Sequence, residues 1–150
     1  MKVTTTFAPL LIIIAGFLSM VSHAAPLAYV PNEKSGSISL IDTATQKVVS
    51  TINTGGTPRG IAVSLDRKWL YVSDRNSNGL LVIDLTKQEV TSRIPLGESP
   101  EGVSMSPDGN WIVAAIEITN SVAFIDTNTQ RVDFSIKTSG KNPEHAEFSP

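Results

Sequence analysis

A period of 42 residues runs through the sequence after its first segment and limits the folds that this chain can adopt. An Ile-Asp pair and a proline both recur with this spacing. The copies are Ile41–Asp42, Ile83–Asp84 and Ile125–Asp126, then Pro58 and Pro100, with Pro143 one residue later than the period requires. A fixed period of this length is typical of repeat architectures, in which each unit buries its apolar faces against its neighbours. The sequence therefore predicts a tandem array of small, similar modules.

Each repeat contains four short segments with the patterning of β-strands. In the copy from Pro58 to Gly97, these apolar or alternating segments are separated by polar turns and cover residues 60–64, 69–73, 80–83 and 89–96. No helical periodicity of apolar residues follows the first segment. Four strands in about 40–45 residues is the size of one propeller blade. We therefore predict an all-β fold, a β-propeller of four-stranded antiparallel blades.

These blades account for the chain from residue 25 to residue 150. The four strands of a blade are lettered a to d in chain order. Strands b to d of a first blade are expected over 27–54, a second blade over 58–97, a third over 100–138, and strand a of the next over 143–150. Because propellers use about four to eight blades, these roughly three blade equivalents do not close a ring. We expect an N-terminal fragment of a propeller with about seven blades. The alternative is that two chains form one ring and self-associate through their unpaired strand edges.

The first 24 residues have the composition of a secretory signal. Lys2 is the only charged residue there, and the stretch from Phe7 to Val21 is mostly apolar. Small residues, Ser22 and Ala24, occupy the −3 and −1 positions of a cleavage site after Ala24. The alternative is an uncleaved membrane anchor, but this stretch is shorter than the ~20 residues that a span needs. We expect cleavage after Ala24, a periplasmic or secreted bacterial protein, and no membrane attachment after cleavage.

Composition excludes several classes of function. The 12 Lys and Arg residues nearly balance 14 Asp and Glu residues, so the chain offers no basic surface for nucleic acid. It has no Cys, which excludes disulfides, thiolate metal sites and a Cys nucleophile. Neither a nucleophile elbow nor a Gly-rich phosphate loop occurs. These features leave the cofactor unidentified.

Two elements of the repeat resemble the YVTN family of β-propeller repeats. The strand signature of that family is matched by Ala28–Asn32 and Leu70–Asp74, and its V-I-D-T-x-T-x-x-V element by Leu40–Val48 and Phe124–Val132. A P-x-G-x-x-x-S-P-D-G element runs from Pro100 to Gly109. The resemblance implies the propeller fold for the whole chain after its first segment. Proteins with similar repeats include surface and periplasmic binding proteins, lactonase-like propellers, and the propellers of methylamine dehydrogenase and nitrite reductase, so the resemblance does not decide the function.

The resemblance also implies where a site would lie. In propellers the loops between strands d and a surround the channel mouth, and the loops between b and c share the same rim. The position after the d–a proline varies along this chain, and His145 then replaces a glycine. A constant frame that varies at its mouth is the expected pattern of a binding rim. The candidate rim residues are Arg59, Glu101, Glu144 and His145 from the d–a loops and Asp74, Arg75, Asn76 and Glu117 from the b–c loops.

His145 is the only histidine after the first segment. It could be an axial haem or metal ligand or a general base, and the alternative is a loop histidine bonded to a neighbour. Because no second histidine or carboxylate has metal-ligand spacing to it, we predict neither a metal site nor a catalytic residue in this chain.

These observations favour an exported propeller whose rim binds a protein or a small ligand. The alternative is an enzyme or redox-accessory propeller, either lactone-hydrolysing or associated with a haem or quinone dehydrogenase. Its site would need residues from further blades.

Overall fold

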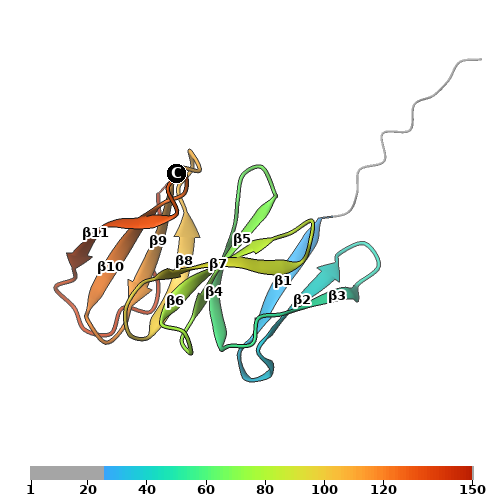
Figure 1. Ribbon diagram of the computed structural model, residues 1–150, viewed down its shortest axis with the longest axis horizontal. Helices are drawn as coiled ribbons and strands as arrows, with labels where there is room; N and C mark the ends of the chain where they lie inside the picture. The colour runs from blue at the N-terminus through green and yellow to red at the C-terminus, as the bar shows by residue number, and fades with distance from the viewer. Residues whose placement is uncertain (1–25, 150) are drawn as a thin grey trace, which may run out of the picture.

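The computed structural model describes residues 26–149, which form three antiparallel sheets that follow one another in chain order (Figure 1). The first sheet has three strands, β1 (Leu27–Asn32), β2 (Ser37–Asp42) and β3 (Lys47–Asn53), with a short 3-10 turn, η1 (Glu33–Ser35), between β1 and β2. The second has β4 (Pro58–Val63), β5 (Trp69–Asp74), β6 (Gly79–Asp84) and β7 (Glu89–Pro95). The third has β8 (Pro100–Met105), β9 (Trp111–Ile116), β10 (Ser121–Asp126) and β11 (Arg131–Lys137). The predicted fold class, an all-β partial propeller, is confirmed.

The expected signal segment, residues 1–24, lies outside the described residues. Within residues 26–149, no helix has both the length and the apolar character that crossing a membrane would require.

The aspartates that recur with the 42-residue period form the turns that follow β2, β6 and β10. The Asp84 carboxylate accepts hydrogen bonds from the backbone N–H groups of Thr86 at 2.8 Å and Lys87 at 3.0 Å. Asp42 and Asp126 make the same pair of bonds in their own turns. A carboxylate that accepts neighbouring N–H groups fixes a tight turn, so these residues serve the fold.

The apolar core lies between successive sheets. The central strand β6 is buried along nearly its whole length, because Leu81 and Ile83 face the first sheet while Leu80 and Val82 face the third. A strand covered on both faces reads as a continuous apolar run, which is what 80–83 shows. Stacking of sheets, rather than closure of each sheet on itself, therefore buries the apolar side chains.

The inner strands approach one another closely at the side of the molecule that carries the candidate rim. A Cβ atom on Gly60 of β4 would lie 2.5 Å from the carbonyl oxygen of Glu101 on β8. One blade further on, the N–H of Gly102 donates to the carbonyl oxygen of Glu144 at 2.8 Å. Residues 143–149 thus lie against β8, as β8 lies against β4. The expected strand over 143–150 is not formed, because no neighbouring strand of its own sheet is present among the described residues to pair with it.

Candidate functional site

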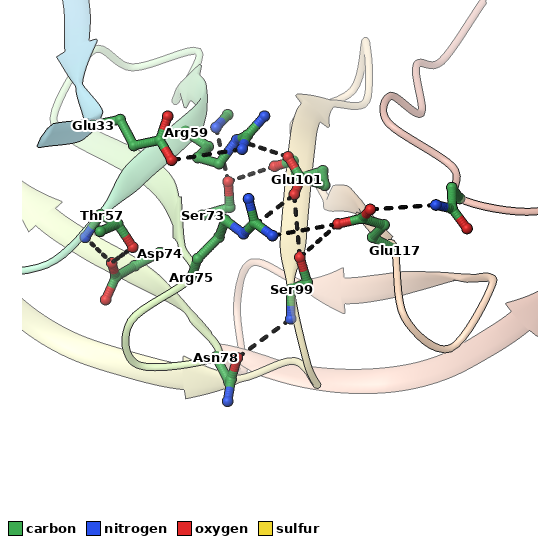
Figure 2. A network of polar contacts seen from close by, with 12 residues as sticks. Glu33, Thr57, Arg59, Ser73, Asp74, Arg75, Asn78, Ser99, Glu101 and Glu117 are labelled. Atoms are coloured by element: carbon green, nitrogen blue, oxygen red, sulfur yellow. Dashed lines mark hydrogen bonds and ion pairs between the residues drawn. The ribbon is translucent and has the colours of Figure 1, made fainter.

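Glu101, at the start of β8, is the centre of a polar network on the rim (Figure 2). Its side chain is only 3% exposed, and its Oε2 atom lies 2.7 Å from Nε of Arg59 on β4. Its Oε1 atom lies 3.5 Å from Nε of Arg75, in the loop between β5 and β6. One buried carboxylate of the third sheet therefore contacts two guanidinium groups of the second.

The network continues from Arg75 to the loop between β9 and β10. Nη2 of Arg75 lies 3.5 Å from Oε2 of Glu117, and the Ser99 hydroxyl donates to the same oxygen at 2.7 Å. The Ser99 hydroxyl also lies 3.3 Å from Glu101 Oε1, and the Asn142 side chain donates to Glu117 Oε1 at 3.4 Å. Ser99 and Asn142 both have left-handed backbone conformations in their d–a loops.

The network reaches the first sheet through Glu33, which the sequence analysis did not single out. Nη1 of Arg59 lies 3.6 Å from Oε1 of Glu33 in η1. The 42-residue period could have identified Glu33 as a rim residue, because Glu33, Arg75 and Glu117 occupy equivalent positions in three successive b–c loops. Acidic and basic residues thus alternate across the rim, in the order Glu33, Arg59, Glu101, Arg75 and Glu117.

The backbone around Glu101 is fixed by a hydroxyl group that is fully buried. The Ser73 hydroxyl on β5 donates to the carbonyl oxygen of Glu101 and accepts from the N–H of Gly60 at 2.8 Å. A buried backbone group without a hydrogen-bond partner is costly. The Ser73 hydroxyl gives a partner to one backbone group of β4 and one of β8, and so links the two strands where their backbones lie close together.

Burial raises the pKa of the Glu101 carboxyl. Arg59, Arg75 and the Ser99 hydroxyl lower it, and the nearby charge of Glu144 raises it, but the cost of removing the charged form from water dominates. The rim therefore contains a carboxylate that is protonated more easily than an exposed one.

Asp74 and Asn76, two further predicted rim residues, belong to the loop framework. The Asp74 carboxylate is buried and accepts from the N–H of Thr57 at 2.5 Å and from the hydroxyl of Ser77 at 2.5 Å. Burial raises the pKa of Asp74, but these hydrogen bonds outweigh it and hold the pKa below its ordinary value. The backbone N–H of Asn76 donates to the same carboxylate at 3.4 Å, while the residue is exposed. Asp74 thus ties a d–a loop to a b–c loop.

Glu144 and His145 lie with Arg59 and Glu101 on the wall of an open cavity of about 250 Å³. Its other lining residues are Pro31, Glu33, Pro58, Gly60 and Gly102, so all three sheets and the segment after the third contribute. A Cβ on Gly102 would collide with the His145 ring, so the absence of a side chain at Gly102 makes room for the histidine. Arg59, Glu101, Glu144 and His145 are therefore brought together, Arg75 joins them through Glu101, and Glu117 joins them through Arg75.

The described residues contain no group of three or more His, Asp or Glu side chains arranged to hold a metal ion. What this arrangement can do is present charged groups of both signs at the edge of a cavity and hold them in fixed positions. Charged groups held in this way can make charge-assisted hydrogen bonds.

Comparison with known proteins agrees with this architecture. The model of the YNCE-like beta-propeller family matches residues 21–106. Among solved structures, a chain of Kuenenia stuttgartiensis hydrazine synthase is similar, with a TM-score of 0.78 and 30% sequence identity. That match covers 83% of the present chain and 36% of the hydrazine synthase chain. No curated protein matches. The resemblance to YVTN repeats stays a prediction.

Proposed function

Because this chain belongs to the YNCE-like beta-propeller family, we propose that it is an exported binding protein whose rim holds a protein or a small ligand at the channel mouth. The cavity lined by Arg59, Glu101, Glu144 and His145 is the observation that carries this proposal. The position after the d–a proline carries Arg59, Glu101 and Glu144 in successive blades, and the next position carries Gly60, Gly102 and His145, so both positions vary along the chain. Variation at the mouth of a constant frame is typical of a surface selected for its ligand.

The charges on the rim support recognition of a polar partner. The Arg59 side chain is 31% exposed and that of Arg75 is 38% exposed, so both guanidinium groups keep donors toward solvent while Glu101 fixes them. Glu144 and His145 are exposed on the same cavity wall. Preorganised charged groups lose little conformational entropy when a ligand binds, which favours specific binding.

The test is a thermal-shift screen of the purified chain against a panel of amino acids, nucleotides, sugars, polyamines and short charged peptides. At a hundred times its Kd, a ligand stabilises the folded state by about 2.7 kcal/mol. For a chain of this length that corresponds to a rise in Tm of roughly 10 °C. We expect at least one compound class to give such a rise.

A matched pair of variants locates the binding site. The rim variant combines Arg59→Ala with Glu144→Ala, and the control combines Lys87→Ala with Glu89→Ala at the c–d turn. Each pair removes one positive and one negative charge. The shift should disappear in the rim variant and persist in the control. A shift that the rim variant retains contradicts the proposal, and a panel without any stabilising compound excludes these ligand classes and leaves only a protein partner.

Export is proposed on the basis of the first segment alone. With residues 1–24 as a signal, the mature protein begins at Ala25 and lies in the periplasm or outside the cell. Amino-terminal sequencing of the protein from the periplasmic fraction should give Ala-Pro-Leu as the first residues. An intact amino terminus starting at Met1 in that fraction would contradict cleavage.

An enzyme or redox-accessory role is the second candidate. It is favoured by the position of His145 on the cavity wall and by the likeness to a chain of hydrazine synthase. A haem-associated role predicts a haem absorption band in the purified protein that His145→Ala abolishes, and a lactonase-like role predicts Ca²⁺ retained after dialysis. Binding of a ligand with neither signal favours the first proposal.

A further inference from the structure

The Glu101 side chain joins the second and third sheets at one point. It is almost completely buried, yet each of its carboxylate oxygens contacts a different guanidinium group, Oε2 that of Arg59 and Oε1 that of Arg75. Arg59 also contacts Glu33 of the first sheet, and Arg75 contacts Glu117 of the third. Both arginines therefore share Glu101, and each has a second acidic neighbour, which is more distant for Arg59 and equally distant for Arg75.

We infer that Glu101 is the positioning residue of the rim, whose single carboxylate holds Arg59 and Arg75 in place and releases both when it is protonated. The consequence for a ligand rests on the proposed function of the rim, but the positioning itself does not. Glu101 is suited to this role because its main chain is also fixed, by the Ser73 hydroxyl that donates to its carbonyl oxygen.

Arg59 depends on Glu101 more than on its other acidic partner, whereas Arg75 lies 3.5 Å from both Glu101 and Glu117. The 2.7 Å distance from Arg59 Nε to Glu101 is that of a charge-assisted hydrogen bond, whereas its 3.6 Å distance to Glu33 is that of a loose ion pair. Glu33 is also half-exposed, so water screens its attraction for Arg59. Loss of the Glu101 charge therefore leaves Arg59 with one weak acidic contact.

Burial of the Glu101 carboxyl raises its pKa and so favours its protonation, and the charge of Glu144 adds to this, whereas Arg59, Arg75 and the Ser99 hydroxyl oppose it. The charged and titratable groups that face it are Arg59 on β4, Arg75 in the β5–β6 loop, Glu117 in the β9–β10 loop and Glu144 in the segment after β11. The burial that raises the pKa of Glu101 brings its titration above the ordinary value of 4.5. Acid would thus remove the negative charge of Glu101 and, with it, the contact that holds the two arginines in position.

The experiment observes the arginine side chains directly and needs no ligand. The chain has five arginines, so the ¹H–¹⁵N spectrum of the uniformly labelled protein contains five Nε–Hε signals. Arg59→Lys and Arg75→Lys each remove one signal and so assign it. The Arg59 Nε–Hε proton, held by a carboxylate, should exchange with water at least tenfold more slowly than those of Arg93 and Arg131.

Glu101→Gln should move the Arg59 and Arg75 signals to the positions of the other arginines and abolish the slow exchange. Because both guanidinium groups are about one-third exposed, water can replace the carboxylate and the fold should persist. Glu98→Gln, an exposed carboxylate in the preceding loop, is the matched control and should move neither signal. Glu101→Asp, which keeps the charge on a shorter side chain, should restore part of the protection.

A pH titration of the unaltered protein tests the same claim without any substitution. The Arg59 and Arg75 signals should titrate with one common midpoint above 4.5. Separate midpoints, or signals that Glu101→Gln leaves in place, would overturn the inference. A rim that fails to bind any ligand but shows the common titration would refute the proposed function and leave the positioning role intact.

Discussion

A glycine in the innermost strand of the second sheet sets how closely the blades approach, and replacing it tests that geometry. A Cβ atom at Gly60 would lie 2.5 Å from the Glu101 carbonyl oxygen, 2.6 Å from the Val103 nitrogen and 2.7 Å from the Gly102 Cα atom. Since unstrained contacts between heavy atoms lie at about 3.5–4.0 Å, β4 and β8 would have to separate by about 1 Å. All three neighbours are backbone atoms, so no side chain can move aside.

Overpacking of this kind costs about 1–3 kcal/mol, and we expect Gly60→Ala to fall at the upper end of that range. The matched control is Gly140→Ala, because a Cβ there meets nothing within 4 Å. Urea unfolding followed by circular dichroism should show Gly60→Ala destabilised by about 2–3 kcal/mol, or roughly 10 °C in Tm. Gly140→Ala should stay within about 0.5 kcal/mol of the parent protein. Equal stabilities of the two variants would refute the close approach of the inner strands.

Three further predictions follow from the packing and the turns. Ser73→Ala leaves backbone groups of β4 and β8 without their buried partner and should cost about 1–3 kcal/mol in urea unfolding; a cost near zero would argue against that bridge. Leu81→Ala opens a cavity between the first two sheets and should cost about 2–5 kcal/mol, against less than about 0.5 for the exposed Val48→Ala; similar costs would place Leu81 outside the core. Backbone N–H groups of the turns lower the pKa of Asp42 and Asp84 below 3.8. Their charged forms therefore stabilise the fold above pH 3.8, and this contribution is lost as the pH falls through their folded-state values. In an acid titration Asp84→Asn should weaken the loss of stability below pH 3.8, and an unchanged acid limb would contradict the turn assignment.

The blade architecture could be predicted because the same sequence motif recurs in each repeat. Ile83–Asp84, for example, marks the end of a doubly covered strand and the carboxylate that fixes the next turn, and both features follow from local chemistry. The backbone conformation follows the same period, as Gln46, Gln88 and Gln130 are all left-handed in equivalent turns.

The rim could be predicted only in part. The sequence places Glu101 among the rim residues but does not show that it is buried; it is buried because the absence of a side chain at Gly60 lets β8 approach. Burial of this kind depends on the distance between two sheets, and the residue pattern of one strand does not predict that distance. Glu33 could not be assigned to the rim from one repeat alone, because its ion pair with Arg59 joins a b–c loop of the first blade to the d–a loop that begins the second.

Radial stacking of equivalent blades is the central claim, and spin-label distances test it most directly. The chain contains no Cys, so pairs of cysteines at the equivalent exposed positions Val49, Thr91 and Asp133 on β3, β7 and β11 can be labelled without background. Pulsed electron paramagnetic resonance should give equal 49–91 and 91–133 distances, with a 49–133 distance clearly shorter than their sum. Unequal neighbouring distances, or a 49–133 distance equal to the sum, would contradict the arrangement of the sheets around a common axis.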